Sequence, residues 1–284
     1  MRKPRHRQDR IAPPWLWPNL LGLDAPAVAV SWQWLFARSF GIELPPVIHI
    51  VLALSAWCIY LADRLLDVFR TQASDLATER HRFTRKYCGR LIIVLVLAAL
   101  VNVILIIRVV PLNLIITGCA TAALLGIYYL IRLGFTGKIG SLIPREFLCG
   151  MLFALGSAIG PHAFAPDGLH EFQFFLPVTF FGFVCSASCI LISIWERDAD
   201  LASSDSSFAT SRAYLIPHVS TALSCLVVSS AALAFFSSWQ LFAATALAAL
   251  ALRITLHFEK NLSRPMRRAL ADALLLTPLI FLLI

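Results

Sequence analysis

The sequence predicts an all-α, polytopic membrane protein with about nine transmembrane helices in a bundle. Three observations carry this prediction. The chain of 284 residues is 59% hydrophobic and only 14% charged, whereas soluble proteins carry about 25% charged residues. Its mean hydropathy is +0.78. The apolar residues also form separate runs that reach the roughly 20 residues needed to cross a bilayer.

Residues 1–23 form a basic tail, and residues 24–284 form a single membrane domain. The tail leads into prolines and tryptophans instead of a signal-peptide core, so we expect it to remain as a cytoplasmic or interfacial segment. The first span is the weakest, because Asp24, Gln33 and Arg38 interrupt it. The predicted spans are residues 24–42, 45–67, 89–108, 112–131, 145–165, 172–195, 212–236, 238–257 and 266–284.

The basic residues predict the orientation of the chain. With nine spans, 22 of the 24 lysines and arginines fall on one side of the membrane, and only Arg38 and Arg108 fall on the other. Basic loops stay in the cytoplasm, so the N-terminus is expected there and the C-terminus across the membrane. The net charge of +8 is then a topology signal that needs no nucleic-acid partner. The tail shows no organelle-targeting pattern, which favours a bacterial inner membrane.

Two short acidic segments end the second and sixth predicted spans. In YLADRLLD, Asp63 and Asp67 are four residues apart, and in ERDAD the outer acids Glu196 and Asp200 have the same spacing around Asp198. Residues four apart share one face of a helix. By the predicted topology, both segments emerge on the cytoplasmic side.

Carboxylates that face one another repel unless cations neutralise them. Oxygen ligands suit Mg²⁺, which commonly bridges carboxylates to substrate phosphates. The two segments therefore indicate a site that holds a diphosphate through metal ions, with apolar spans beside it for a lipophilic tail. The alternative is that Asp63–Arg64 and Glu196–Arg197 are ordinary interfacial charges at helix ends.

This arrangement resembles the UbiA-type prenyltransferase superfamily, whose members have nine spans and aspartate-rich motifs after the second and sixth. IYLADRLLD lies where the family has NDxxDxxxD, so Asp63 and Asp67 match its last two aspartates, while Ile59 and Tyr60 replace the leading Asn-Asp. ERDAD lies where the family has DxxxD, without the lysine that often follows. The segment PREFLCGMLFALGSAIG, residues 144–160, resembles the fifth span of the family.

The resemblance implies a central cavity that opens near the cytoplasmic face. It also implies Mg²⁺-dependent transfer of a prenyl group from a polyprenyl diphosphate to a lipophilic acceptor, aromatic or a quinone precursor. The implied catalytic residues are the metal ligands Asp63, Asp67, Glu196 and Asp200, with Asp198 as a candidate proton acceptor. The implied substrate-binding residues are Arg64, Arg145 and Arg197 for phosphate, and Tyr60, Tyr128, Tyr129 and Trp195 for the allylic cation.

Other readings stay open. An inactive family member that binds lipid or acts as a membrane scaffold is the main alternative, since the Asn-Asp pair is missing. A transporter is less favoured, because the helix break at Gly156, Gly160 and Pro161 has no matching partner. A CDP-alcohol phosphotransferase is disfavoured, because no glycine precedes Asp63 as its signature requires. Among the remaining polar residues, we expect Arg268 to pair with Asp272, and Asn102 to join two helices.

Overall fold

The computed structural model describes residues 13–70, 79–134, 144–202 and 207–282, and all regular structure in these ranges is helical. The predicted all-α class is therefore confirmed. The elements are η1 (Pro14–Leu16), α1 (Trp17–Leu21), α2 (Asp24–Ser39), α3 (Pro46–Arg70), α4 (Glu79–Lys86), α5 (Cys88–Val109), α6 (Leu112–Gly134), α7 (Arg145–Ala163), α8 (Glu171–Ala202), α9 (Phe208–Ser211), η3 (Ala213–His218), α10 (Val219–Leu233), α11 (Trp239–His257), η4 (Glu259–Asn261), α12 (Arg264–Ala273) and η5 (Leu274–Leu282).

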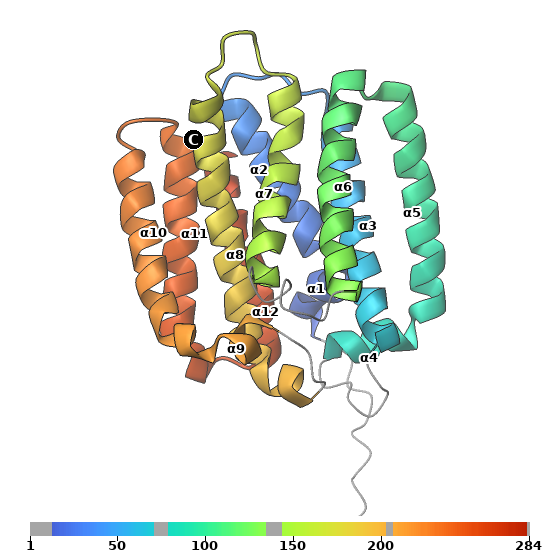
Figure 1. Cartoon of the computed structure of the whole chain (residues 1–284), viewed down its shortest axis with the longest axis vertical. Helices are drawn as coiled ribbons and strands as arrows, with labels where there is room; N and C mark the ends of the chain where they lie inside the picture. The colour runs from blue at the N-terminus through green and yellow to red at the C-terminus, as the bar shows by residue number, and fades with distance from the viewer. Residues whose placement is uncertain (1–12, 71–78, 135–143, 203–206, 283–284) are drawn as a thin grey trace, which may run out of the picture.

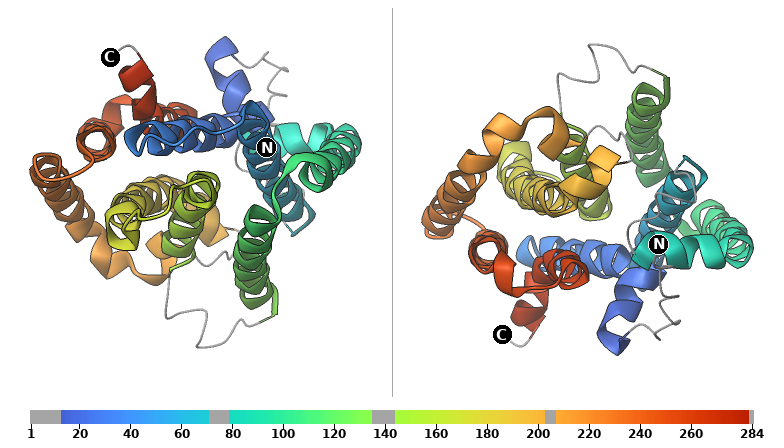
Figure 2. Two further views of the ribbon diagram at one scale, coloured as in Figure 1. Left: turned by 90° about the horizontal axis from the view of Figure 1, so that it is seen from above. Right: turned by 90° about the horizontal axis from the view of Figure 1, so that it is seen from below.

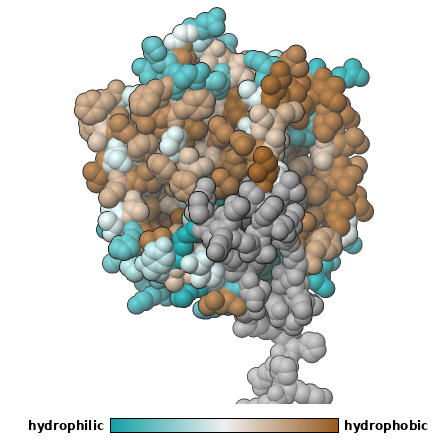
Figure 3. All heavy atoms as spheres, in the orientation of Figure 1, coloured by the Kyte–Doolittle hydropathy of each residue, from teal (hydrophilic) through white to brown (hydrophobic). Residues whose placement is uncertain are grey.

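Within these ranges, five helical segments are long and apolar enough to cross a membrane. They are Pro46–Phe69, Cys88–Val109, Glu171–Asp198, Ala213–Leu233 and Trp239–His257. A sixth is possible where Pro14–Leu21 and Asp24–Ser39 meet at an angle of 79°. One face of the molecule is apolar between two hydrophilic ends (Figure 3). A membrane protein is thus supported, while the count of nine spans remains a prediction.

The other three predicted spans fall on helices of different character. In α6 the apolar stretch is short, Leu112–Ile127. Helix α7 begins with the charged pair Arg145 and Glu146 and contains Pro161. The last predicted span, residues 266–284, is divided between the polar helix α12 and the apolar 3₁₀ segment η5. None of these three helices is among the candidate membrane spans of the described chain.

The long helices lie side by side along one direction (Figure 1). Viewed along the bundle, α7 and α8 lie beside α2, with α10 and α11 on one side and α3, α5 and α6 on the other (Figure 2). The short helices α1, α4, α9 and α12 gather at one end, where the C-terminal ends of α3 and α8 also lie (Figure 1). This end of the bundle therefore collects segments that are far apart in the sequence.

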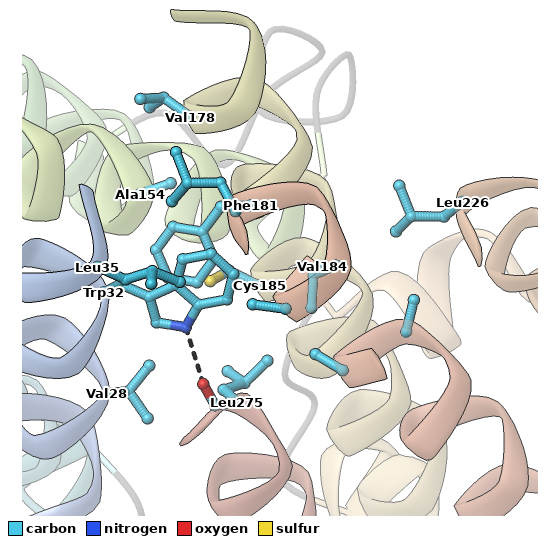
Figure 4. Packing of buried hydrophobic residues seen from close by; sticks show 14 of the residues in the cluster. Val28, Trp32, Leu35, Ala154, Val178, Phe181, Val184, Cys185, Leu226 and Leu275 are labelled. Atoms are coloured by element: carbon cyan, nitrogen blue, oxygen red, sulfur yellow. Dashed lines mark hydrogen bonds between the residues drawn. The ribbon is translucent and has the colours of Figure 1, made fainter. Parts of the chain in front are cut away.

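The centre of the bundle is filled with aromatic side chains. The Trp32 ring stacks on Phe181 at 3.8 Å between ring centroids, and its Nε1 donates a hydrogen bond of 2.8 Å to the Leu275 carbonyl oxygen (Figure 4). Phe36 and Phe174 extend this cluster, and both are fully buried. These contacts join α2, α8 and η5. The predicted central cavity is therefore not confirmed in this layer, where ring packing occupies the space.

A groove of about 540 Å³ lies between α8 and α10 and is almost entirely apolar. Its aromatic lining comes from α7, α8 and α9, namely Phe147, Phe180, Phe183 and Phe208.

On the opposite side of the bundle, Asn102 of α5 donates to the Ser55 hydroxyl of α3 at 2.8 Å, which confirms the predicted helix-joining role of Asn102.

Helices α7 and α8 cross at unusually close range. A Cβ atom added to Gly150 would lie 2.6 Å from the Ser186 Cα. The Ser186 hydroxyl donates to the carbonyl oxygens of Gly182 at 2.7 Å and Phe147 at 3.0 Å. Small residues allow membrane helices to approach in this way, and the hydroxyl satisfies its donor across the contact.

We expect Gly150→Ala to lower the midpoint of thermal unfolding by roughly 3–8 °C, because the added methyl group meets α8 backbone that cannot move independently. Gly156→Ala is the matched control on the same helix, because a Cβ atom added to Gly156 has no neighbouring atom within 4 Å. The measurement is tryptophan fluorescence during heating in detergent. Equal midpoints for the two variants would contradict the close crossing.

Candidate functional site

The candidate site lies at the end of the bundle where α3 and α8 terminate. Helix α3 carries Asp63 and Asp67 on its last two turns, and α8 carries Glu196, Asp198 and Asp200 near its end. Helices α1, α4, α9 and α12 surround these termini (Figure 1). The structure thus brings the two sequence-predicted acidic segments to the same end of the molecule.

The first acidic segment faces the beginning of α7. Asp63 and Asp67 are half-buried, one turn apart. The charge of Asp63 acts on the Cys149 thiol together with those of Arg145 and Glu146. The charges of Asp63 and of Arg145, the sequence-predicted phosphate ligand, thus both act on the start of α7. Asp63, Asp67 and Asp200 each take part in interactions, so none is an isolated carboxylate.

Glu146 is a structural residue of this end that the sequence analysis did not identify. It is 5% exposed, and its Oε1 accepts hydrogen bonds from the Phe208 backbone amide at 2.9 Å and from Arg145 Nε at 3.3 Å. A carboxylate at the first turn of α9 satisfies a free helix amide. Glu146 thus fixes α9 against α7. Its position as a charged residue at the start of the predicted fifth span could have indicated a buried polar contact.

The second acidic segment is bound by arginines of α12. Arg268 Nη1 donates to both carboxylate oxygens of Glu196 at 2.6 Å, with side chains 14% and 22% exposed respectively. Arg264 Nη2 donates to Asp198 Oδ2 at 2.7 Å, in a pair that is mostly exposed. The expected pairing of Arg268 with Asp272 is wrong. Arg268 pairs with Glu196 of α8 instead of with Asp272, which lies one turn further along α12.

Asp272 belongs to a second polar group beside this ion pair. The Asn19 amide donates to Asp24 Oδ2 at 2.6 Å and to Asp272 Oδ2 at 3.1 Å. The two carboxyl groups therefore share one donor from α1. Asp24, which in the sequence only weakens the first predicted span, holds α2 to α1 and α12. Sequence spacing gives no signal for this contact across 253 positions.

Arg64, a predicted phosphate ligand, is buried on the side of α3 that packs against α1. It is 2% exposed, its Nη1 donates to the Leu20 carbonyl oxygen at 3.0 Å, and its guanidinium lies 4.3 Å from the Tyr60 ring centroid. This contact is a cation–π interaction. Tyr60 and Arg64 thus join α3 to α1 and do not face Arg145.

The remaining predicted site residues are dispersed. Arg197 is exposed at the end of α8. Trp195 is buried, and its Nε1 donates to Glu259 Oε2 at 2.7 Å, which ties α8 to η4. Tyr128 and Tyr129 lie on α6, and their side chains fall outside the described part of the structure. Of the predicted aromatic set, Tyr60 and Trp195 are therefore engaged by other groups of the chain.

Arg80 is a further basic residue of this end, and the sequence analysis treated it only as a topology signal. Burial lowers the pKa of the Arg80 guanidinium below its usual value, and the neighbouring charges of Arg268 and Arg64 lower this pKa further. Three guanidinium groups therefore act on one another at this end. A cluster of like charges is costly without counter-ions.

The residues fit a magnesium ion only in part. Among the described residues, no group of three or more His, Cys, Asp and Glu side chains is placed to hold a metal. Both oxygens of Glu196 are occupied by Arg268. Asp63, Asp67 and Asp200, which also take part in other interactions, complete the predicted ligand set.

No protein-family model, curated protein or solved structure matches this chain. The resemblance to UbiA-type prenyltransferases therefore depends on the two acidic segments, their order and the helical layout. Any function drawn from it is a proposal.

We expect Glu196→Gln to destabilise the protein by ~3 kcal/mol, because it leaves Arg268 without its counter-charge in a largely enclosed position. Asp198→Asn is the matched control on the same helix. It breaks a pair whose side chains are 76% and 63% exposed, so its cost should stay below about 1 kcal/mol. Chemical unfolding in mixed micelles measures both. Equal costs would show that the Arg268 pair is no more enclosed than the Arg264 pair.

Proposed function

We propose that the protein is an intramembrane prenyltransferase that transfers a prenyl group from a polyprenyl diphosphate to a lipophilic acceptor, with Mg²⁺ as cofactor. One observation carries the proposal: the two acidic helix ends, on α3 and α8, lie at the same end of the bundle, around the start of α7. The proposal includes nine spans, a cytoplasmic N-terminus, a C-terminus across the membrane and a bacterial inner membrane.

In this proposal, Asp63, Asp67 and Asp200 would hold the metal. A magnesium ion would neutralise the diphosphate as it leaves. Arg145, at the start of α7, and Arg197, exposed at the end of α8, would contact the phosphate oxygens. Guanidinium groups suit this role because their fork of donors matches phosphate geometry. Asp198 is the candidate proton acceptor, after release from Arg264.

The apolar groove between α8 and α10 supplies a place for the prenyl chain. Phe147 lines it two residues after Arg145, and Phe208, which also lines it, donates its backbone amide to Glu146. The groove therefore begins beside the basic start of α7, where the diphosphate would bind. Its phenylalanine rings suit an isoprenoid chain and the allylic cation that forms when diphosphate leaves.

A lipid-binding or scaffolding protein of the same family, without turnover, is the second candidate. The ion pair between Arg268 and Glu196 favours it, because one of the predicted metal ligands of the second acidic segment is neutralised within the chain. The replacement of the leading Asn-Asp by Ile59 and Tyr60 points the same way. The two candidates differ in whether bound prenyl diphosphate is consumed.

The test is binding of geranylgeranyl diphosphate to the purified protein in detergent, with and without Mg²⁺. We expect Mg²⁺-dependent binding that weakens roughly tenfold or more in Asp67→Asn and in Asp200→Asn, because each removes a metal ligand. Asp167→Asn is the control, since it makes the same charge change in the loop at the other end of α7 and α8.

Release of diphosphate when aromatic and quinone-precursor acceptors are added would support the transferase. Mg²⁺-dependent binding without release under these conditions would favour the lipid-binding candidate. Binding that ignores both Mg²⁺ and the two substitutions would contradict a shared metal site.

A further inference from the structure

Three arginines from three helices lie at the acidic end of the bundle, near enough for their charges to act on one another. Arg64 of α3 is fully enclosed, Arg268 of α12 holds Glu196, and Arg80 of α4 lies within reach of both of their charges. The charge of Arg268 also acts on Tyr60, whose ring carries the Arg64 guanidinium. These residues form the arginine cluster: Arg64, Arg80 and Arg268.

The arginine cluster has fewer acceptors than donors. The buried Nε and Nη2 of Arg64, Nε of Arg80 and Nε of Arg268 have no hydrogen-bond partner among the described residues. Among the described acids, Glu196 is hydrogen-bonded to the cluster, and both of its oxygens accept from Arg268 Nη1. Asp24 and Asp272 lie nearby but share the Asn19 amide. Buried donors without acceptors are rare in proteins, because leaving them unpaired costs free energy.

We propose that the arginine cluster is a second anion site, which binds a phosphate group. A phosphate offers several acceptor oxygens in a tetrahedral arrangement, so it can receive hydrogen bonds from three guanidinium groups at once. A single carboxylate offers two oxygens and one charge, and Glu196 already supplies these. A phosphate would satisfy the enclosed donors and offset the repulsion among the three cations.

This site is separate from the proposed metal site. Asp63 and Arg64 are adjacent in sequence, so their side chains leave α3 about 100° apart. Asp63 acts on α7, whereas Arg64 donates to Leu20 of α1. The arginine cluster thus lies on the face of α3 directed at α1, and it requires neither prenyl diphosphate nor Mg²⁺.

The surroundings place the arginine cluster near the level of lipid headgroups. Trp15 and Trp17 expose their rings next to it, and Trp17 meets Phe83 of α4 edge-on at 5.9 Å between ring centroids. Arg82 and Lys86 are exposed on α4. Interfacial tryptophans and basic side chains are typical of headgroup depth. The phosphate can therefore come from an anionic phospholipid, and inorganic phosphate offers the same chemistry from solution.

Thermal unfolding of the full chain tests the site without any prenyl substrate. In detergent, sodium phosphate is compared with sodium chloride at equal ionic strength. In nanodiscs, phosphatidylcholine alone is compared with phosphatidylcholine containing phosphatidylglycerol. The variant is Arg80→Gln, and its matched control is Arg82→Gln, which removes the same charge from the exposed face of α4. Arg80→Lys keeps the charge but lacks the planar fork and serves as a second variant.

We expect the phosphate group to raise the unfolding midpoint of the wild type and of Arg82→Gln by roughly 3 °C or more. The rise should fall to less than half in Arg80→Gln and in Arg80→Lys. Without the anion, Arg80→Gln should unfold at or above the wild-type midpoint, because it removes one of three repelling cations. That baseline separates loss of binding from loss of folding.

The two arms identify the source of the phosphate. A rise produced by phosphatidylglycerol but not by inorganic phosphate assigns the site to a lipid headgroup, and the reverse assigns it to a soluble anion. If wild type, Arg80→Gln and Arg82→Gln respond equally in both arms, the site does not exist. These outcomes do not depend on Mg²⁺ or prenyl diphosphate. The experiments on transferase activity and on phosphate binding can therefore give opposite results, and each proposal is tested separately.

Discussion

The ion pair between Arg268 and Glu196 organises the functional end of this protein. It joins α12 to the end of α8 across 72 positions of sequence, and both side chains lie largely out of solvent. By fixing α12 there, it also places Asp272 beside Asn19 of α1 and brings Arg268 near Arg80. A charge pair in such a position adds little net stability over an apolar contact, but it strongly disfavours arrangements that separate its partners. The geometry around the end of α8 therefore depends on this pair.

The two acidic segments look equivalent in sequence but have different environments. Asp198 and Glu196 of the second segment are each bound by an arginine of α12. In the first, Arg64 donates to Leu20 of α1, and the charge of Asp63 acts on Cys149 of α7. A motif that counts carboxylates cannot distinguish these cases, because the partners come from distant helices.

The pattern of apolar runs predicted most helices correctly, but it could not predict side-chain pairs between residues that are distant in the sequence. The second predicted span, residues 45–67, closely matches α3, and the sixth, residues 172–195, lies within α8, because both are long apolar runs with clear ends. The last span was predicted as one apolar helix, but its first part belongs to the polar helix α12, which ends at Ala273, and the apolar segment η5 follows directly. Arg268 was assigned to a neighbour one turn away, but a carboxylate on another helix binds it. The burial of Arg80 could not be predicted, since a basic run between spans has the composition of an exposed loop.

The long sequence separation within the Arg268–Glu196 pair also sets an order of events during synthesis. Because Arg268 is made 72 residues after Glu196, α8 enters the membrane with its terminal acid unpaired and waits through the synthesis of α10 and α11. The Trp32–Leu275 hydrogen bond spans 243 positions and likewise awaits η5. The acidic end of the bundle is thus completed only after α12 and η5 have been synthesised, and the nascent chain cannot present this end in its final form before then.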